Sequence, residues 1–447
     1  FTHLHVHSNY TFCRGANSLD QICQSARLRG MSHIAVTDTN GFYGLVTFIQ
    51  TAKSYKLIPV IGAHLEHDNN NCVILAKNIN GYRFICSLIS QIQQKSAIPL
   101  FKLLENNPEH DCIIFSHDLA FLAQMVKQKK VKNLFVEIIP YSNREEALLF
   151  SRKNNIPPVA SNAVYFIEPE DYKIHQLLRA IDLNTTLERV PPQELASHKA
   201  QLLSCEQMQQ MYPDCPEALA NTQLLANECT FDLDFKEFIF TSYKSTDSQD
   251  PMTILREKVL KGIAWRYKTI TKEIMQRMDY ELSLIEEKDF APYFLVAQDI
   301  VQKAPRTCGR GSAAASLVSY CLGITHVDPI KYDLFFERFL NKGRMDPPDI
   351  DVDFPWDERD DILDYIFQKY GADSTAMISN HVTFKARSAV HEIAKVYGIP
   401  EKEISLRTKK MTGYWQPSHI WELTQMHPIY KNTDFPPPWP EIIQLAE

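Results

Sequence analysis

The chain has 447 residues, too many for one hydrophobic core, and we expect it to fold as about two to four domains. Hydrophobic residues make up 45% and charged residues 23%, as in ordinary soluble globular proteins, and no apolar run approaches the roughly 20 residues of a membrane span. The formal net charge of −7 argues weakly against nucleic-acid binding over the whole surface, although the distribution of charge matters more than its sum.

The sequence shows no targeting segment and no cysteine framework. The chain does not begin with the basic segment and apolar core that are typical of a signal peptide. Because it begins at Phe1 without a methionine, we expect the true start to lie upstream. None of the ten cysteines forms a Cys-x-x-Cys pair, so we predict reduced thiols and neither disulfides nor a zinc site. These features indicate a cytoplasmic protein.

The N-terminal segment Thr2–His7 alternates histidine with leucine and valine. This period of two predicts a first strand with His3, His5 and His7 on one face. Imidazoles gathered on one face are a candidate metal site, although a single histidine is more often structural.

A repeated rhythm of helical segments and short apolar runs follows. Amphipathic helices are predicted at 19–29 and 45–54. The predicted strands are 33–37, 58–62, 71–76, 111–115, 133–138 and 157–160. This alternation predicts parallel strands in a barrel or a doubly wound sheet. Such folds place their catalytic and binding residues just after the strand ends. The polar residues at these positions are Asp38, Thr39, His64, Ser116, His117 and Asn162.

Less regular segments separate this part from the next. Residues 183–235 have a polar, helical pattern, and the composition of Tyr243–Pro251 predicts a linker. Helices are expected from Met252 to Lys288, followed by an apolar segment from Phe290 to Ala304.

The motif Gly309-Arg310-Gly311-Ser312 leads into an alanine-rich segment that we predict to be helical up to Tyr320. A helix start offers free N–H groups and a positive dipole end, and glycine lets a phosphate approach the backbone. The alternative is a plain helix cap. A phosphate site is favoured because a strand of carboxylates follows, and nucleotide transfer needs both a triphosphate site and a metal site.

The whole chain is organised around Pro347–Phe354, in which acidic and large apolar residues alternate after two prolines. The period of two predicts a strand with Asp349, Asp351 and Asp353 on one face. Side chains two residues apart on a strand lie roughly 7 Å apart, so these acids repel one another unless cations lie between them. Two divalent ions held in this way stabilise an in-line displacement at phosphorus. An exposed sheet edge is the alternative.

Several further elements are predicted around this strand. Arg338, among aromatic residues, is either a phosphate contact or an ion-pair partner near Glu337. The pattern predicts a helix at 358–370, a strand at 376–379 and a basic helix at 383–395. Lys385 and Arg387 on that helix are candidates for binding a phosphate backbone, and a solvated helix face is the alternative. The proline-rich end predicts no terminal element.

The N-terminal part resembles the PHP (polymerase and histidinol phosphatase) domain, a metal-dependent phosphoesterase barrel of the (β/α)7 type. The motifs that match are Leu4-His5-Val6-His7, Thr37-Asp38 and Ile61-Gly62. The resemblance implies a Zn²⁺ or Mn²⁺ site formed by His5, His7, Asp38 and His64.

This sequence departs from the PHP pattern at several ligands. Thr39 replaces a histidine and His64 replaces a glutamate. A late Asp-x-His pair falls on Ala163 and Tyr165. We therefore expect the barrel to be structural or to bind metal weakly.

An ordered series of motifs resembles the C-family DNA polymerases, the bacterial DNA polymerase III alpha subunits. The series is Arg310-Gly311-Ser312, Leu322–Thr325, Asp328-Pro329, Phe336–Asn341 and Pro348–Phe354. The resemblance implies that Asp349 and Asp351 bind two catalytic Mg²⁺ ions. It also implies a nucleotide site formed by Arg310, Gly311, Ser312 and Arg338. Two segments, Tyr10–Ala16 and Asn380–Arg387, look more like the error-prone branch of the family than the main replicase. This resemblance implies a role in DNA repair.

The resemblance implies an α/β multidomain architecture. Residues 1–228 are expected to form the PHP domain, 229–379 the first segment of a polymerase-β-like nucleotidyltransferase palm, and 380–447 an incomplete, mainly helical thumb. A third catalytic aspartate and the fingers are expected downstream of Glu447, so this chain alone is expected not to extend primers. Expected partners are primer–template DNA, deoxynucleoside triphosphates and, through the downstream part, a sliding clamp and other replication or mutagenesis factors.

Two other functions stay open on the sequence. One is a PHP-type phosphoesterase or 3′–5′ exonuclease carried by the histidines. The other is a DNA-binding remnant without catalysis.

Overall fold

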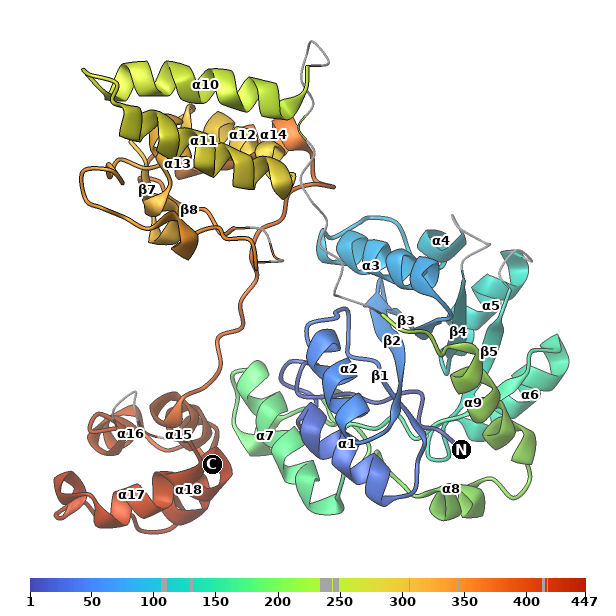
Figure 1. Cartoon of the computed structure of the whole chain (residues 1–447). Helices are drawn as coiled ribbons and strands as arrows, with labels where there is room; N and C mark the ends of the chain where they lie inside the picture. Colours follow the sequence, from blue (N-terminus) through green and yellow to red (C-terminus); the bar gives the residue numbers. More distant parts are fainter. Residues whose placement is uncertain are drawn as a thin grey trace. The chain divides into compact units, whose positions relative to one another are not determined.

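The computed structural model describes the chain except for residues 106–110, 129–131, 234–242, 244–248, 305, 345, 347, 412–414 and 416. Pro347 of the predicted acidic strand and part of the predicted linker therefore lie outside the described residues. The chain divides into two compact units (Figure 1). The first unit is Phe1–Leu233 with Val382–Glu447, and the second unit is Asp234–His381. None of the described helices is both long and apolar enough to span a bilayer.

The first unit is built on a curled sheet of six strands that follow one another in chain order. They are β1 (His33–Val36), β2 (Ile58–His67), β3 (Asn70–Ala76), β4 (Cys112–Ser116), β5 (Leu134–Ile138) and β6 (Pro158–Ala160). All six begin within one residue of their predicted starts. These apolar runs are strands because both faces of the sheet are covered, which buries most of their residues.

The prediction of parallel strands throughout is wrong at β3. This strand pairs antiparallel with both β2 and β4, whereas β1–β2, β4–β5 and β5–β6 are parallel. The cause is the two-residue turn Asp68-Asn69, whose φ angles of 52° and 58° suit a tight hairpin. Asp and Asn tolerate this left-handed conformation better than most residues.

The predicted first strand at Thr2–His7 is also not a regular strand. The segment instead bonds to both ends of the sheet. Ala35 N donates to His3 O (3.1 Å) and Thr37 N to Val6 O (2.8 Å), both beside β1. On the other side, His7 N donates to Val164 O (2.8 Å), beyond β6. The expected seven-stranded barrel is therefore a curled six-stranded sheet with an irregular N-terminal segment across its two edges.

Helices cover the sheet of the first unit (Figure 1). They are α1 (Leu19–Leu28), α2 (Leu45–Ser54), α3 (Ile79–Gln93), α4 (Leu100–Glu105), α5 (Leu119–Gln128), α6 (Arg144–Asn154), α7 (Tyr172–Asp182), α8 (Cys205–Met211) and α9 (Pro216–Glu228). Short 3₁₀ turns are η1 (Pro169–Asp171), η2 (Leu187–Arg189) and η3 (Pro192–Glu194). The predicted helices at 19–29 and 45–54 are confirmed. Helix α1 begins where Ser18 and Gln21 form a capping box.

The C-terminal segment completes the first unit with four helices and two 3₁₀ turns. They are α15 (Ala386–Val396), α16 (Glu401–Thr408), η6 (Pro417–His419), α17 (Ile420–Met426), η7 (Pro428–Tyr430) and α18 (Trp439–Ala446). Val390 and Ile393 of α15 share an apolar cluster with Leu177 of α7. The predicted absence of a terminal element is wrong, because the side chain of Trp439 is fully buried in this cluster and stabilises α18.

The second unit is mainly helical (Figure 1). Its elements are α10 (Pro251–Arg266), α11 (Lys272–Glu287), α12 (Ala291–Val301), β7 (Cys308–Arg310), η4 (Gly311–Ala315), α13 (Leu317–Cys321), η5 (Phe336–Arg338), β8 (Asp351–Asp353) and α14 (Arg359–Tyr370). One apolar cluster joins α10, α11, α12 and α13, and Ile350 and Val352 pack against it. The helices expected at 252–288 and 358–370 are confirmed, but the strand expected at 376–379 is an exposed extended segment.

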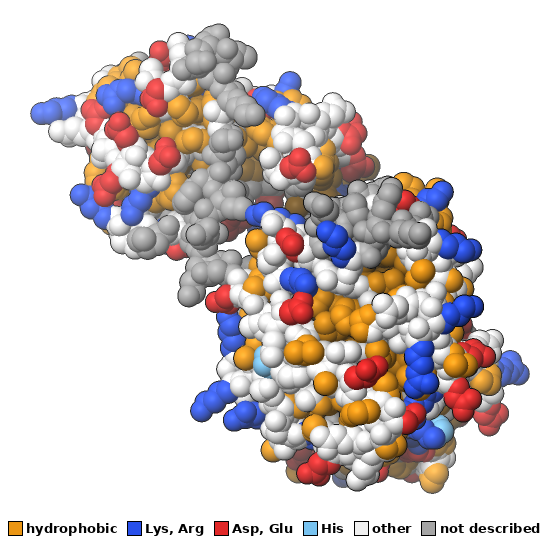
Figure 2. Space-filling view, turned by 90° about the vertical axis from the view of Figure 1, so that its right-hand side faces the viewer, with side chains coloured by type: hydrophobic (Ala, Val, Ile, Leu, Met, Phe, Trp, Pro, Cys, Tyr) orange, Lys and Arg blue, Asp and Glu red, His pale blue; other side chains and the backbone are white. Residues whose placement is uncertain are grey.

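On the face shown in Figure 2, basic and acidic side chains are interspersed over the described residues. That view shows no broad single-sign patch, in keeping with a modest net charge of −7.

Candidate active site

The Gly-Ser motif and the acidic segment are neighbours because β7 and β8 pair with each other. The two strands are antiparallel, with Arg310 opposite Asp351 and Cys308 opposite Asp353. The ladder is short, three residues on each strand. It brings together two motifs that lie about 40 residues apart in the sequence.

Gly311 follows β7 directly and lies against the acidic strand. Its φ of +70° is the left-handed region, which glycine adopts without strain. A Cβ placed on Gly311 would lie 3.5 Å from Oδ2 of Asp351. Ser312, the next residue, is half-buried.

The predicted alternation of the acidic segment is confirmed. Asp349, Asp351 and Asp353 are exposed, whereas Ile350 and Val352 are half-buried against the helices. Regular strand structure begins only at Asp351, so Asp349 precedes it.

The third acid of the segment has a different neighbour from the other two. Oδ1 of Asp353 forms an exposed ion pair with Nε of Arg310 at 3.2 Å. The Tyr293 hydroxyl accepts a hydrogen bond from the Ile350 amide (3.2 Å), and burial, together with the charges of Asp349 and Asp351, raises its pKa. The carboxylates of Asp349 and Asp351 are oxygen ligands of the kind Mg²⁺ prefers, so these residues fit a magnesium site.

The predicted long helix after Gly311 is wrong, because the segment forms the 3₁₀ turn η4 and then the five-residue helix α13. The start of α13 is already occupied by a buried carboxylate. Glu281 of α11 accepts hydrogen bonds from Leu317 N (2.9 Å), Val318 N (3.1 Å) and Ser316 Oγ (2.9 Å). The amides of α13 are therefore not available to a phosphate, which leaves the turn at Gly311 and Ser312 as the candidate cradle.

Glu281 is itself held by Arg277, one helical turn earlier. The Arg277 guanidinium contacts Glu281 Oε1 (2.7 Å) and also donates to the carbonyls of Ala315 (3.0 Å) and Leu334 (2.8 Å). Arg277 thus ties the end of η4 to the segment before η5. Sequence reasoning missed it, and the available signal was an acid in the apolar stripe of a helix.

The other predicted nucleotide and DNA contacts are exposed. Arg338 lies in η5 and is exposed, and no ion pair or hydrogen bond of its side chain is found among the described residues, so its role stays a prediction. Lys385 precedes α15 and Arg387 lies in its first turn, both exposed in the first unit.

A second candidate site lies in the first unit, where three histidines meet. The Nε2 atoms of His5 and His7 are 3.1 Å apart, and ligand atoms of His5, His7 and His64 all lie within 4.8 Å of one another. Over the described part of the chain, this is the one group of three or more such side chains close enough to share an ion. His3, expected on the same face, instead bonds to the carbonyl of Leu203 (2.9 Å).

Glu137 on β5 orients this cluster and was not predicted. Its buried carboxylate bonds to His5 Nδ1 (2.7 Å) and His117 Nδ1 (3.0 Å). The available signal was an acid inside the apolar strand Leu134–Ile138. Burial would lower the pKa of His117, but the hydrogen bond and charge of Glu137 outweigh it and raise that pKa.

Asp38, predicted as a ligand, is not in the cluster. It accepts hydrogen bonds from Ser8 N (2.7 Å), Ser8 Oγ (2.7 Å) and Thr11 Oγ1 (2.7 Å). Thr11 Oγ1 in turn lies 3.0 Å from Nδ1 of His7. Asp38 therefore acts on the cluster through Thr11.

The histidine cluster fits a single transition-metal ion. Burial, followed by the neighbouring imidazoles, holds the pKa of His7 well below its usual value, and burial also lowers that of His64, so both rings are neutral. Among the residues that the structure describes, neither ring nitrogen of buried His64 has a hydrogen-bond partner. Neutral imidazoles are ligands for Zn²⁺ and Mn²⁺, and Glu137 on His5 supplies the usual orienting carboxylate. Tyr165 stacks on His7 with ring centroids 4.1 Å apart.

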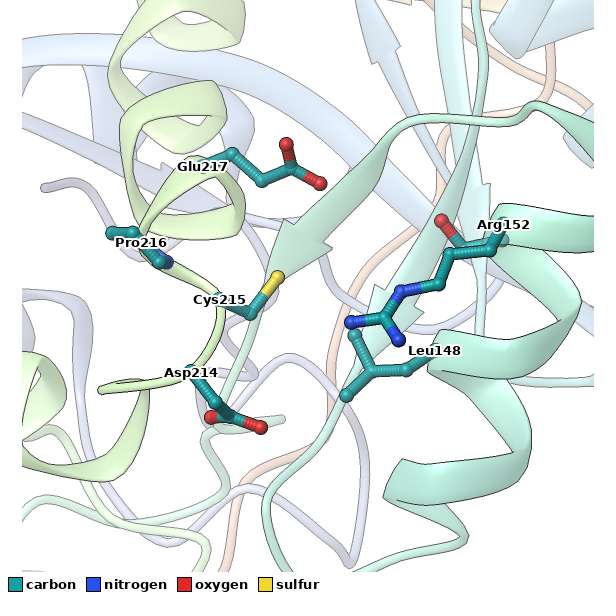
Figure 3. Close-up of a pocket in the computed structure, with 7 residues that line it drawn as sticks. Leu148, Arg152, Asp214, Cys215, Pro216 and Glu217 are labelled. Atoms are coloured by element: carbon teal, nitrogen blue, oxygen red, sulfur yellow. The ribbon is translucent and has the colours of Figure 1, made fainter.

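A separate pocket of about 300 Å³ lies between α6 and the start of α9. Figure 3 shows Arg152, Asp214 and Glu217 around the thiol of Cys215. Its lining contains none of the residues predicted from the sequence, and its mixed charges favour no ligand class.

Two family models match this chain. Residues 253–441 match the model of the bacterial DNA polymerase III alpha NTPase domain, and residues 3–135 match that of the PHP domain. A solved structure described as a metal-dependent phosphoesterase, from Bifidobacterium adolescentis, covers 36% of this chain and 86% of its own, with 10% identity and a TM-score of 0.26. That score is too low to compare folds.

Curated relatives align over nearly all of the chain. An error-prone DNA polymerase of Symbiobacterium thermophilum is 30% identical over 100% of this chain and 45% of its own length. The DNA polymerase III subunit alpha of Bacillus subtilis is 31% identical over 90% of this chain and 39% of its own length. The chain thus spans less than half the length of these relatives. With a PHP domain followed by a polymerase III alpha NTPase domain, it belongs to the family of bacterial DNA polymerase III alpha subunits and error-prone DNA polymerases.

Proposed function

We propose that the protein containing this chain is a DNA-directed DNA polymerase. The reaction is attack of a primer 3′-hydroxyl on the α-phosphorus of a deoxynucleoside triphosphate, directed by a template, with release of pyrophosphate. The observation that carries the proposal is the β7–β8 ladder, which sets the Gly311–Ser312 turn beside Asp351. A phosphate cradle next to paired carboxylates is what nucleotidyl transfer requires.

Each residue of this site has a role that follows from its position. Asp349 and Asp351 would hold two Mg²⁺ ions, which when bound lower the pKa of the attacking hydroxyl and offset the charge on the phosphates. The turn at Gly311 and Ser312 brings backbone N–H groups to the triphosphate without a side chain in the way. Arg310 and Arg338 are exposed cations able to neutralise phosphate charge.

Primer extension by the full-length protein tests these assignments. Asp349→Asn and Asp351→Asn are each expected to lower the extension rate roughly 10³-fold or more, while nucleotide affinity changes less. Asp360→Asn, an exposed acid in the first turn of α14, is the matched control. Wild-type rates in either of the first two variants would remove them from the site. The 447-residue chain is expected not to extend primers by itself.

We further propose that the protein belongs to the error-prone branch and acts in DNA repair. The support is the sequence of Tyr10–Ala16 and Asn380–Arg387, together with the relative of that name aligned over the whole chain. The prediction is extension past an abasic site at a rate comparable with extension on undamaged template. Arrest at the lesion would favour a replicative role.

The start of α15 is proposed to contact duplex DNA through Lys385, which precedes the helix, and Arg387 in its first turn. Both are exposed, and a cation that neutralises a phosphate makes binding depend on salt. Replacing both with Gln should flatten the slope of log affinity against log salt by about 2 for duplex DNA. An unchanged slope would make this a solvated helix face. A sliding clamp is proposed as a partner outside this chain.

A second candidate function is a PHP-type phosphoesterase or 3′–5′ exonuclease. The observation in its favour is the cluster of His5, His7 and His64, in which neither ring nitrogen of His64 forms a hydrogen bond with a described residue. The replaced ligands Thr39 and Tyr165 count against it. Hydrolysis of p-nitrophenyl phosphate with Zn²⁺ or Mn²⁺ that survives Asp351→Asn but is lost in His7→Ala would support it. If both Asp351→Asn and His7→Ala keep the hydrolytic activity, the activity belongs to a contaminant.

A further inference from the structure

A groove of about 600 Å³ lies in the second unit between α10, α12 and the residues after α13. One face of α10 forms a wall with Lys258, Lys261, Gly262 and Trp265, spaced so that they lie along one side of a helix. None of the lining residues belongs to the proposed catalytic site.

The groove is positively charged. Lys258, Lys261 and His326 line it, and the described lining residues include no Asp or Glu. Asp299 on α12 does not line the groove; it accepts hydrogen bonds from Lys369 and the Tyr365 hydroxyl, and its charge also acts on Lys258. In a chain with a net charge of −7, a 600 Å³ groove without a lining carboxylate favours an anionic ligand.

An exposed aromatic ring stands at one end of this groove. Trp265 is 65% exposed, unusual for so large an apolar side chain. The guanidinium of Arg266 lies 3.9 Å from the ring centroid and is held by the carbonyls of Tyr320 (3.0 Å) and Thr325 (3.1 Å). Gly323, with φ +78°, has no side chain, and a Cβ on it would lie 3.9 Å from Cζ3 of Trp265. The ring is therefore fixed in place and accessible.

Amide side chains complete the chemistry. Gln298 of α12 and Gln302, which follows that helix, line the groove. Gln298 is buried and its Oε1 accepts a hydrogen bond from Lys258 Nζ (2.6 Å), whereas Gln302 is exposed. Lys261 has no such partner among the described residues. Amides can pair with the edges of bases, an indole offers a stacking face and lysines neutralise phosphates.

We propose that this groove binds single-stranded nucleic acid, with phosphodiester groups at Lys258 and Lys261 and one base stacked on Trp265. The ligand class follows from the combination, because an acidic peptide would use the lysines but would not need the ring. The site is separate from the proposed active site, so Asp351→Asn is expected to leave this binding unchanged. A failure of one proposal is therefore distinguishable from a failure of the other.

The test measures binding of a fluorescein-labelled dT12 oligonucleotide to the 447-residue chain by anisotropy. Trp265→Ala is expected to weaken binding about 5- to 150-fold, the range for loss of one stacked base. Lys258→Gln with Lys261→Gln should flatten the slope of log affinity against log salt by about 1.4. Matched controls are Trp356→Ala, an 89% exposed tryptophan of the same unit, and Lys268→Gln with Lys272→Gln, two exposed lysines outside the groove.

The controls are expected to bind dT12 like the unchanged chain. Equal affinity in the Trp265 and Lys258/Lys261 variants would overturn the proposal, as would equally tight binding of a 12-residue poly-Glu peptide. Urea unfolding of each variant shows whether a loss of binding comes from the missing side chain in the groove or from a loss of folding. If Lys258→Gln lowers the free energy of unfolding, Lys261→Gln alone, which breaks no described contact, decides the outcome.

Discussion

Gly311 and Asp351 are neighbours across a two-strand ladder, with 3.5 Å between the position of a Cβ on Gly311 and Oδ2 of Asp351. The turn and the carboxylate are thus one structural element. A change in the backbone of the turn is expected to move the carboxylate.

Gly311→Ala tests this coupling. At φ +70° an alanine costs about 1–2 kcal/mol of backbone strain, so we expect the free energy of unfolding to fall by about that amount. Primer extension by the full-length variant should fall as well, because relief of the strain moves the turn. Denaturant unfolding and extension rates check both effects. Gly343→Ala, where no positive φ applies, should change neither. Wild-type stability and rate in Gly311→Ala would contradict the coupling.

Glu281→Gln is expected to destabilise the second unit by about 2 kcal/mol. The carboxylate accepts from two backbone amides and one hydroxyl, whereas an amide side chain turns one acceptor into a donor. Denaturant unfolding measures the loss, and Glu286→Gln on the exposed side of the same helix is the control. Equal stability of the two variants would show that the cap contributes little.

The same residue predicts a pH dependence. Burial raises the pKa of Glu281 above its ordinary value of 4.5, despite the hydrogen bonds from Leu317 and Arg277. The native state therefore binds this proton more tightly than the unfolded state, and the contribution of Glu281 to stability falls as pH rises above 4.5. The difference in unfolding free energy between wild type and Glu281→Gln should therefore shrink as the pH rises above 4.5. A difference that grows with pH would reverse the assigned direction.

Thiol labelling should separate buried from exposed cysteines. Burial raises the pKa of Cys23 and Cys321 to about 12, so at pH 8 only about one part in 10⁴ of either thiol is ionised. Cys308 on β7 is exposed. Iodoacetamide should alkylate Cys308 well before the other two, as followed by peptide mass spectrometry. Comparable rates at Cys321 would mean that the second unit opens readily.

Metal content tests the histidine cluster. With three imidazoles in reach of one another, we expect no more than one tightly bound Zn or Mn per chain by X-ray fluorescence. His64→Ala should abolish it, whereas His67→Ala, at the end of β2 and bonded to the Ile98 carbonyl, should not. A count near three would show that other residues replace the missing PHP ligands.

Local sequence patterns predicted most of the helices and strands, whereas strand direction and the partners of buried acids depend on contacts between distant residues. The alternation in Asp349–Phe354 indicated which side chains are exposed, because that depends only on the period of a strand. The antiparallel placement of β3 was readable from Asp68-Asn69, but the prediction gave more weight to the helix–strand rhythm. The roles of Glu137 and Glu281 depend on partners far away in the sequence, at His117, His5 and Leu317, which no local pattern reveals.

The C-terminal segment from Val382 belongs to the same unit as the PHP domain, through α15 and α7. The second unit is therefore an insertion within a discontinuous domain. A protease that cuts only near 240 and 380 would free the inserted unit, yet the two remaining fragments should copurify, held by the apolar cluster that Leu177 shares with Val390 and Ile393. A truncation at residue 233 would instead expose those surfaces, so expression of the PHP domain should require the distant C-terminal helices.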